Sequence, residues 1–371
     1  MKILIAPDKF KATLTASRVA EAIARALRHK FPDAQIHQQP MADGGEGSLN
    51  LIAATLPGLK TQRLRVTGPL RKPVTARYLY GNGHAFIETA EACGLKHVPV
   101  PRRDPRYTTT IGVGQLIDDA IARGATDVTL FLGGSATNDC GVGMAAALGY
   151  RFFSDRPNDF VPTGESLCYV QRIDTNGVPT HLQKVRFTAV CDVDNPLTGP
   201  RGATHVYAPQ KGAVPEDLAG LEENMAHFAN TVADWKGLRL QNLPGAGAAG
   251  GLAAGAIAFL NADLRPGIDV IIEAVGFDAL LENVDLVVTG EGKIDAQTPC
   301  GKVVSGVARR AKAAGVSRVI ALCGRNELSE KAARAMGLDA VHALLDLPAM
   351  TSARALHRTE EALEELIGRR F

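Results

Sequence analysis

Three segments of the sequence combine glycines with carboxylates directly after a short apolar run. They cover residues 43–47, 133–143 and 290–301 and include Asp43, Gly44, Gly45, Glu46, Gly47, Gly133, Gly134, Asp139, Gly141, Gly143, Gly290, Glu291, Gly292, Asp295 and Gly301. Glycine lets backbone N–H groups approach an anion closely, and in an open α/β sheet ligands bind at the carboxyl ends of strands. One such segment is more often an ordinary turn or helix cap. Three of them together favour a phosphate-handling cleft.

Two more segments carry groups that phosphoryl transfer needs. Asp192 and Asp194 follow an apolar run and would face one side if the strand continued. Lys211 lies in a tight turn, and Lys9 and Lys11 follow the first apolar run. Phosphoryl transfer uses backbone N–H donors and a lysine around the phosphates, carboxylates for a divalent cation, and a base that orients the acceptor hydroxyl.

Other catalytic and cofactor motifs are weak or absent. Residues 245–250 match G-x-G-x-x-G, but the stretch before them is a poor strand, so a dinucleotide site is not favoured. A Walker phosphate loop is missing, and Ser135 lacks the second glycine of a hydrolase nucleophile elbow. The nine histidines show no zinc-binding spacing.

Composition excludes several classes of protein. The 371 residues include 38 glycines without a collagen-like period, and 46% of the residues are hydrophobic, which is enough for a packed core. The net charge of +2, with interspersed signs, and the 5% aromatic content give no nucleic-acid or membrane signature. The six cysteines form no C-x-x-C pair, and the first apolar run is too short for a signal peptide. We therefore expect a cytoplasmic protein with reduced thiols.

Apolar periodicity predicts an α/β protein with two domains. Strands are expected at residues 2–6, 35–41, 74–80, 85–90, 127–132, 185–191, 285–289, 318–323 and 340–345, and helices at 15–31, 48–56, 111–123, 215–235, after 244, and at 303–314, 329–336 and 349–367. Strands and helices alternate at both ends of the chain, whereas the middle is mixed and contains a hairpin signal. We predict a doubly wound parallel-sheet domain made of residues 1–66 and 276–371, with residues 67–275 inserted as a mixed α/β domain.

The motifs, in their order along the chain, resemble those of the bacterial glycerate kinase family. The matching segments are residues 6–11, 40–47, 133–139, 192–197, 208–213, 244–251, 289–298 and 301–302. The resemblance implies a flavodoxin-like domain with a restriction-endonuclease-like insertion. It also implies ATP-dependent phosphorylation of D-glycerate, at the 2-hydroxyl, with magnesium, giving 2-phosphoglycerate and ADP.

Physical roles can be assigned to the matching positions. We expect Asp192 to be the base, because burial at a strand end could raise its pKa, with Lys11 and Lys211 as the other catalytic residues. The expected substrate contacts are Lys9, Ser135, Asn138 and Asp139, the expected phosphate and nucleotide contacts are Gly44, Gly45, Gly133, Gly134 and Lys302, and the expected metal ligands are Asp43, Glu291 and Asp295.

Three alternatives stay open at this point. The same kinase could produce 3-phosphoglycerate, the chain could be a nicotinamide-dependent hydroxyacid oxidoreductase, or it could bind a metabolite without catalysis. The expected partner is the small-molecule substrate. The sequence leaves the oligomeric state open, with a homodimer as one alternative.

Overall fold

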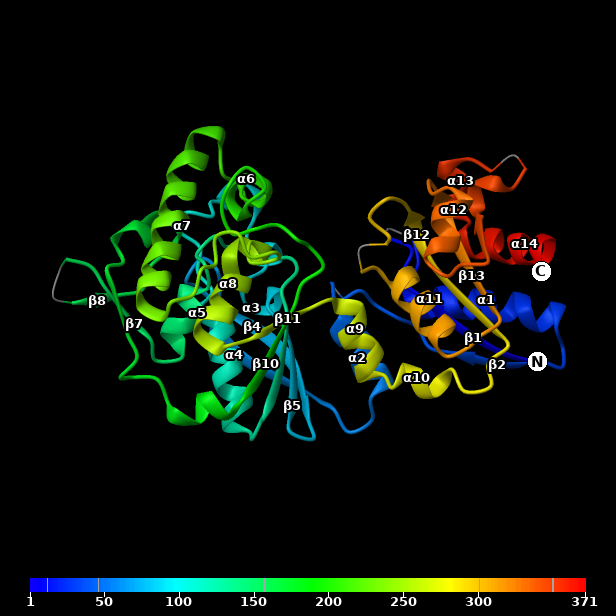
Figure 1. Cartoon of the computed structure of the whole chain (residues 1–371), viewed down its shortest axis with the longest axis horizontal. Coiled ribbons are helices and arrows are strands. Elements are labelled where there is room, and N and C mark those ends of the chain that lie inside the picture. The colour runs from blue at the N-terminus through cyan, green and yellow to red at the C-terminus, as the bar shows by residue number, and fades with distance from the viewer. Residues whose placement is uncertain (12, 46, 156–157, 300, 349) are drawn as a thin grey trace. The chain divides into compact units, whose positions relative to one another are not determined.

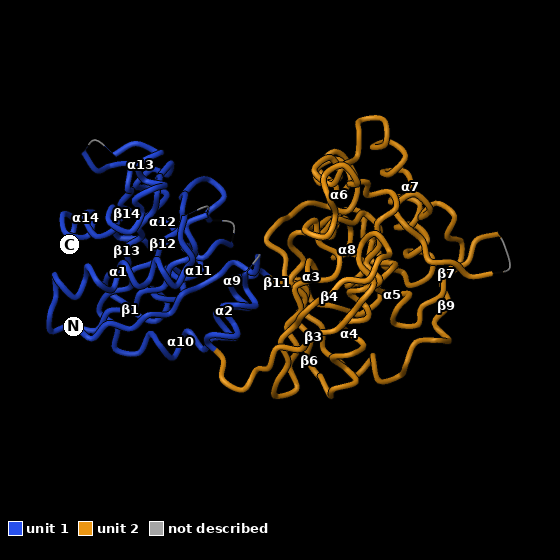
Figure 2. Tube along the Cα trace, turned by 180° about the vertical axis from the view of Figure 1, so that it is seen from behind, with its two compact units in different colours: residues 1–55, 266–371 blue, residues 56–265 orange. Residues whose placement is uncertain are grey.

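The computed structural model describes all residues except 12, 46, 156–157, 300 and 349, and has an α/β fold. The chain forms two compact units (Figures 1 and 2). Unit 1 contains Met1–Thr55 and Pro266–Phe371, and unit 2 contains Leu56–Arg265. None of the described helices is both long and apolar enough to cross a membrane. Glu46, one of the acids noted above, lies outside the described residues.

The elements of unit 1 alternate between strands and helices. The strands are β1 (Lys2–Pro7), β2 (Gln35–Gln38), β12 (Leu286–Ile294), β13 (Arg318–Asn326) and β14 (Ala340–Ala343), and the helices are α1 (Ala16–Lys30), α2 (Ser48–Thr55), α9 (Gly267–Ala274), α10 (Phe277–Leu280), α11 (Val303–Ala313), α12 (Glu330–Ala335), α13 (Ser352–His357) and α14 (Thr359–Arg370). All pairings in the sheet are parallel, in the order β14-β13-β12-β1-β2.

Helices cover both faces of this sheet. Ile3 and Ile5 of β1 share an apolar cluster with α1 and α14. Leu4, which lies between them, is also fully buried. Successive residues of a strand point to opposite faces, so burial of all three means that both faces are covered. Helix α11 contacts β12 and β13. Thr15 caps α1 as expected, accepting a hydrogen bond from the Arg18 N–H.

Unit 2 is built on a mixed sheet. Its strands are β3 (Lys60–Thr67), β4 (Pro73–Gly81), β5 (His84–Glu88), β6 (Asp127–Phe131), β7 (Arg151–Phe153), β8 (Asp159–Phe160), β9 (Arg172–Asp174), β10 (Arg186–Val190) and β11 (Asp263–Arg265), and its α-helices are α3 (Ala90–Cys93), α4 (Ile111–Ala122), α5 (Val142–Ala147), α6 (Ala203–Tyr207), α7 (Pro215–Lys236) and α8 (Ala248–Leu260). The main sheet has the order β11-β10-β6-β5-β4-β3, in which β5, β6, β10 and β11 are parallel and β3 and β4 are antiparallel to their neighbours. Strands β8, β7 and β9 form a small separate sheet.

The unit boundaries differ from those expected at residues 66 and 275. The chain passes from unit 1 to unit 2 after Thr55 and returns at Pro266. The first boundary moves because β3 pairs with β4 along its whole length, from Lys60 opposite Tyr80 to Thr67 opposite Pro73. Residues 56–66 therefore belong to unit 2, and its strand β3 lies where no strand was expected.

Candidate active site

A buried carboxylate follows β1 in unit 1. Asp8 is only 5% exposed, its Oδ1 accepts a hydrogen bond from the Lys9 N–H at 2.7 Å, and its own N–H donates to the Gly290 carbonyl of β12 at 2.8 Å. Burial and the nearby charges of Asp43 and Glu291 raise the pKa of Asp8 to about 7, against the lowering effect of Lys9. Our residue assignments missed Asp8. The available signal was an acid directly after the first buried strand.

Asp43 is held in a tight turn of the same unit. Its Oδ1 accepts a hydrogen bond from the Gly45 N–H at 3.0 Å, and Gly44 has a φ of +85°. The carbonyl of Asp43 lies against the first residue of α9, so that a Cβ on Gly267 would stand 1.9 Å from that oxygen. Gly44 and Gly45 in the turn and Gly267 beside it thus have conformations or contacts that favour glycine. These requirements explain part of the glycine surplus without a ligand.

Glu291 and Asp295 are linked through a lysine. The Thr298 hydroxyl donates to Glu291 Oε1 at 2.8 Å, and Lys302 Nζ lies 3.7 Å from Glu291 Oε2 and 3.3 Å from Asp295 Oδ1. Burial raises the pKa of Glu291 in spite of Thr298 and Lys302. For Asp295, burial is outweighed by the Gln297 N–H and by the neighbouring lysines, which lower its pKa.

These carboxylates fit magnesium only in the presence of additional ligands. Among the described residues, no group of three or more His, Cys, Asp or Glu side chains is arranged to hold a metal ion. The expected trio of Asp43, Glu291 and Asp295 therefore does not form a metal cage, because each carboxylate is already directed toward its own N–H, hydroxyl or lysine partner. Magnesium takes only oxygen ligands, typically one or two carboxylates together with water and phosphate oxygens, and this donor set suits that mode.

Lys9 and Lys11 lie in the segment that follows β1. Lys11 is exposed and Lys9 is half-buried. The backbone of this segment passes close to β12, since a Cβ on Gly292 would be 3.3 Å from the Lys11 nitrogen. Both lysines therefore belong to the same edge of the sheet as Asp8 and Glu291.

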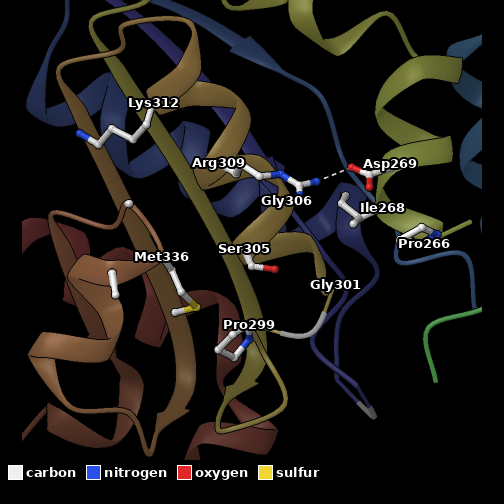
Figure 3. Close-up of a pocket in the computed structure, with 12 residues that line it drawn as sticks. Pro266, Ile268, Asp269, Pro299, Gly301, Ser305, Gly306, Arg309, Lys312 and Met336 are labelled. Carbon is white, nitrogen blue, oxygen red and sulfur yellow. Dashed lines mark hydrogen bonds and ion pairs between the residues drawn. The ribbon is translucent and has the colours of Figure 1, made fainter. Parts of the chain in front are cut away.

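A cavity of about 590 Å³ opens in unit 1 (Figure 3). It is lined by Pro266, Ile268 and Asp269 from the start of α9, by Pro299, Gly301, Ser305, Gly306, Arg309 and Lys312 from α11 and the segment before it, and by Ala335, Met336 and Gly337 from the end of α12. Arg309 forms an ion pair with Asp269, drawn as a dashed line in Figure 3. None of the apolar lining residues was singled out from the sequence.

In unit 2, the segment after β6 contains two exposed glycines followed by a buried run. Gly133 and Gly134 are exposed, whereas residues 135–139 are buried. The register pairs Phe131 with Val190 of β10 and with Glu88 of β5, and Val190 pairs with Arg265 of β11. The carboxyl ends of these parallel strands therefore meet at one edge. Arg265 and Glu88 lie at this edge and were missed. For Arg265 the reason is that three-residue β11 gives too short a pattern to be recognised, whereas Glu88 lies at the end of β5, where a strand was expected.

Lys211 is a buried lysine and 3% exposed. Its Nζ donates to the Ser135 hydroxyl oxygen at 3.0 Å and to the Thr137 carbonyl at 2.6 Å. Burial lowers its pKa to about 8, and the neighbouring Cys93 and Asp139 act in the opposite direction. The structure does bring Lys211 and Ser135 together. Both are buried, and in this conformation Lys211 holds the segment through these two bonds.

Asp139 has a structural role in this conformation, and Asn138 is buried beside it in the chain. Both are fully buried. The Thr110 N–H and hydroxyl donate to Asp139 Oδ2 at 2.9 Å each, and the Gly141 N–H donates to Oδ1, so the carboxylate satisfies the starts of α4 and α5. Burial raises the pKa of Asp139 against these bonds. The expected substrate contacts at Asn138 and Asp139 thus have no exposed surface to offer a ligand.

Asp192 has a different environment from the one expected. It lies two residues beyond the end of β10 and is exposed, so the burial on which its expected role as base depended is absent. The strand does not continue to Asp194, which instead forms an exposed ion pair with Arg201 at 2.9 Å. Asp192 does leave the sheet at the same edge as Gly133, since each follows a member of the Val190–Phe131 pair by two residues.

The glycines of residues 245–251 pack the fold together. Ala249, Gly250 and Gly251 all have left-handed backbone angles, and a Cβ on Gly250 would be 1.9 Å from the Thr137 carbonyl. No described strand precedes α8 directly, so the dinucleotide fingerprint lacks its structural context. The segment serves as a tight support for residues 137–140.

Comparisons with known proteins decide the family. A model described as the glycerate kinase family matches residues 3–369. The chain belongs to the glycerate kinase family. Members of this family are phosphotransferases, so the chain is an enzyme, and the resemblance drawn from the motifs is confirmed.

Individual relatives agree with this assignment. The chain is 44% identical over 347 residues to a protein named glycerate kinase from Bacillus subtilis, covering 93% of this chain and 90% of the relative. It is 43% identical over 314 residues to glycerate 2-kinase from Escherichia coli, covering 84% and 82%. A crystal structure assigned as glycerate kinase 2 from Salmonella typhimurium LT2 has a TM-score of 0.85 and 39% identity, covering 99% of this chain and 95% of that one.

Proposed function

We propose that this kinase transfers the γ-phosphoryl group of ATP to the 2-hydroxyl of D-glycerate, giving 2-phosphoglycerate and ADP. The observation that carries the proposal is the gathering of Asp8, Asp43, Glu291 and Lys302 in unit 1, within a chain of the glycerate kinase family. The choice of the 2-hydroxyl is supported by the name of the Escherichia coli relative, glycerate 2-kinase.

The strand order supports a flavodoxin-like architecture for unit 1. Numbered within the unit, the order β2-β1-β12-β13-β14 is 2-1-3-4-5, that of doubly wound flavodoxin-like sheets. In such sheets ligands bind where the order reverses, here between β1 and β12, and Asp8 and Glu291 lie on those strands or directly after them. The restriction-endonuclease-like nature of unit 2 rests on the family resemblance alone.

In unit 1, we assign the carboxylates to the metal side of the reaction. Asp8, Asp43 and Glu291 would supply one or two ligands to magnesium, which when bound neutralises charge on the phosphates. Lys302 and the exposed Lys11 would bind phosphate oxygens, with the Gly44 and Gly45 backbone as further donors. Lys302 is well suited to this because its carboxylate partners already hold it at the start of α11.

In unit 2, we assign the acceptor side of the reaction. Asp192 takes the proton from the 2-hydroxyl, the hydroxyl oxygen forms a bond to the γ-phosphorus, and the bond from that phosphorus to the β-bridging oxygen breaks as ADP leaves. Exposed Gly133 and Gly134 leave the same sheet edge and could donate N–H groups. Arg265 would suit the carboxylate of glycerate, because a guanidinium binds a carboxylate with two parallel hydrogen bonds.

A coupled assay tests the whole proposal. Purified chain with ATP, magnesium and D-glycerate should release ADP, and adding enolase should then consume the product, because enolase acts on 2-phosphoglycerate and not on the 3-isomer. ADP release without an enolase signal would assign the product as 3-phosphoglycerate. No ADP release would favour a metabolite-binding protein, and a change in nicotinamide absorbance with glycerate would favour an oxidoreductase.

The base assignment has its own test. Asp192→Asn removes the proton acceptor, and we expect kcat to fall by about 10²–10⁴-fold, the usual contribution of general acid–base catalysis. Asp194→Asn is the matched control, since its exposed carboxylate pairs with Arg201 and should be dispensable. Near-normal turnover of Asp192→Asn at saturating substrate would show that Asp192 is not the base.

We also propose a cytoplasmic location. In its support, the described cysteines Cys93, Cys140, Cys168, Cys191 and Cys323 are unpaired thiols.

A further inference from the structure

We infer that the cavity along α11 binds the nucleoside end of ATP, with the phosphates directed toward Lys302. This inference rests on the proposed kinase reaction and locates one of its substrates. The cavity contains none of the residues assigned to catalysis, metal or glycerate.

Two points of its lining connect the cavity to the carboxylate edge of unit 1. Gly301 lines the cavity and directly precedes Lys302, whose Nζ lies 3.3 Å from Asp295 and 3.7 Å from Glu291. On the other side, Pro266 and Ile268 line the cavity and flank Gly267, which packs against the carbonyl of Asp43. On both sides, therefore, residues that line the cavity are adjacent in sequence to residues that are, or that contact, the groups assigned to the phosphates and magnesium.

The size of the cavity distinguishes between the two substrates. Its volume of about 590 Å³ lies within the range of sites that bury drug-sized ligands. D-Glycerate has three carbons, each bearing oxygen, and would fill only a small part of this space. A purine nucleoside is the larger, flatter and less polar half of the substrate pair.

The chemistry of the walls also favours a nucleoside. Ile268 and Pro266 line one side of the exposed face of α11, and Met336 and Pro299 line the other side (Figure 3). Apolar walls suit the faces of a heterocycle, and methionine adapts to a flat ring. Arg309 stands between them but is bound to Asp269, so its charge is already compensated and the cavity is not a simple phosphate site.

The small residues Ser305 and Gly306 leave this space open. Gly306 brings α9 and α11 into contact, because a Cβ there would be 2.3 Å from Ile268 Cγ1. Ser305 lies on the cavity-lining face of α11, and its hydroxyl donates to the Lys302 carbonyl at 2.9 Å. A larger residue at 305 would occupy the cavity and would replace none of the side chains assigned to catalysis, although it removes the hydrogen bond to the Lys302 carbonyl.

The test fills the cavity and compares two probes. In Ser305→Phe, the dissociation constant for ATP and the KM for ATP should rise by about tenfold or more, which corresponds to about 1.4 kcal/mol. The affinity for inorganic tripolyphosphate and the KM for D-glycerate should stay near the wild-type values. Ala313→Phe is the matched control, since residue 313 is exposed on the same helix and does not line the cavity; it should leave all four values unchanged.

Two results would overturn the inference. One is an unchanged ATP affinity in folded Ser305→Phe. The other is an equal loss of ATP and tripolyphosphate binding, which would place phosphates and not the nucleoside in the cavity. If Ser305→Phe does not fold, Met336→Gln makes one wall polar at nearly constant volume and should weaken ATP binding several-fold; unchanged binding in that variant would also overturn the inference.

Calorimetric binding is measured without D-glycerate, so the two proposals can fail separately. One outcome is that the wild-type chain binds ATP, Ser305→Phe does not, and the wild type releases no ADP with D-glycerate. This result would retain the cavity assignment and reject the kinase reaction. Wild-type activity with no effect of Ser305→Phe on ATP would retain the reaction and reject the cavity.

Discussion

Asp8 shows how burial can set the chemistry of a single carboxylate. Its pKa is about 7 in the folded chain against an ordinary value of 3.8, because burial and Asp43 disfavour the charged form. Its protonated form stabilises the fold fully below pH about 4, and this contribution is lost as the pH rises through 7. Between these values the carboxylate also becomes available to a cation.

The corresponding prediction concerns the free chain without magnesium or nucleotide. The free energy of unfolding, measured in urea, should lose about 2–3 kcal/mol from Asp8 between pH 5 and pH 8. Asp8→Asn removes this loss, so the variant should be more stable than wild type at pH 8 by more than it is at pH 5. Asp33→Asn, at an exposed position of the same unit, is the control. An equal difference from wild type at both pH values would contradict the assignment.

A second residue-scale prediction concerns Lys211. Lys211→Met removes a buried charge, which favours folding, but leaves the Thr137 carbonyl without its donor, which disfavours folding. These effects oppose each other, so we expect little net change in the free energy of unfolding. In contrast, kcat should fall by about 100-fold, as is typical when a catalytic segment is misplaced.

The pH profile separates positioning from simple structural support. In wild type, kcat should decline as the pH rises through about 8, where Lys211 loses the charge that strengthens its bonds to Ser135 and Thr137. This decline should be absent from the residual activity of Lys211→Met. Lys184→Met, at an exposed position of unit 2, should match wild type throughout. A Lys211→Met profile that retains the decline would assign it to another group.

Sequence predicted where the polar residues lie along strands, but not how exposed they are. Asp192 and Asp139 follow strands in similar local contexts, yet one is exposed and the other is fully buried. The difference arises because Thr110 and Gly141, the residues that precede α4 and α5, both donate N–H groups to Asp139, and Thr110 is far from Asp139 in the chain. Asp8 was overlooked for the same reason, since its environment includes Gly290 of β12 and the charge of Asp43, which are distant from it in the sequence.

At the scale of elements, Gly250 at the start of α8 makes a very close contact with another segment. Gly250→Ala would place a Cβ 1.9 Å from the Thr137 carbonyl at a φ of +70°, so both space and backbone conformation oppose it. We expect the free energy of unfolding to fall by about 2–4 kcal/mol. Gly220→Ala is the control, because it lies in α7 with nothing within 4 Å and should stabilise the helix by about 0.5–1 kcal/mol.

Denaturation curves of the two alanine variants would decide this point. If Gly250→Ala is as stable as wild type, the support of residues 137–140 by the glycine-rich segment is not rigid. If it is destabilised and kcat falls further than the loss of folded protein explains, the segment also positions Ser135 and its neighbours.

Long, strongly patterned elements could be predicted from sequence, whereas short ones could not. Helix α7 and strand β6 lie within one residue of their expected bounds. The expected helix at 349–367 is instead α13 and α14, separated at Arg358, because Thr359 directs its hydroxyl to the Ala355 carbonyl and Glu360 starts a new first turn. Strands β8 and β11 contain too few residues to show an alternating pattern.

At the scale of the whole molecule, each unit has its own apolar core. The large cluster of unit 2 extends from Val66 to Ala262, and a separate cluster of unit 1 joins α1 and α14 to its parallel sheet. The sequence predicted a discontinuous first domain from its alternation of strands and helices. It misplaced the first boundary because Gly68-Pro69 and Lys72-Pro73 suggested a change of domain, whereas residues 68–72 only join β3 to β4.

The last prediction tests this boundary with two excised segments. Because unit 2 is continuous in sequence and has its own core, residues 56–265 should fold alone and unfold cooperatively, with a free energy of about 5–15 kcal/mol. Residues 67–275, the segment expected from sequence, lack most of β3, which exposes the edge of β4 and removes the packing of Val66. That segment should melt at a lower temperature and aggregate. The measurements are circular dichroism and light scattering. Equal melting temperatures and monomeric behaviour for both segments would show that β3 is dispensable to unit 2. If neither segment folds, the core of unit 2 requires the rest of the chain.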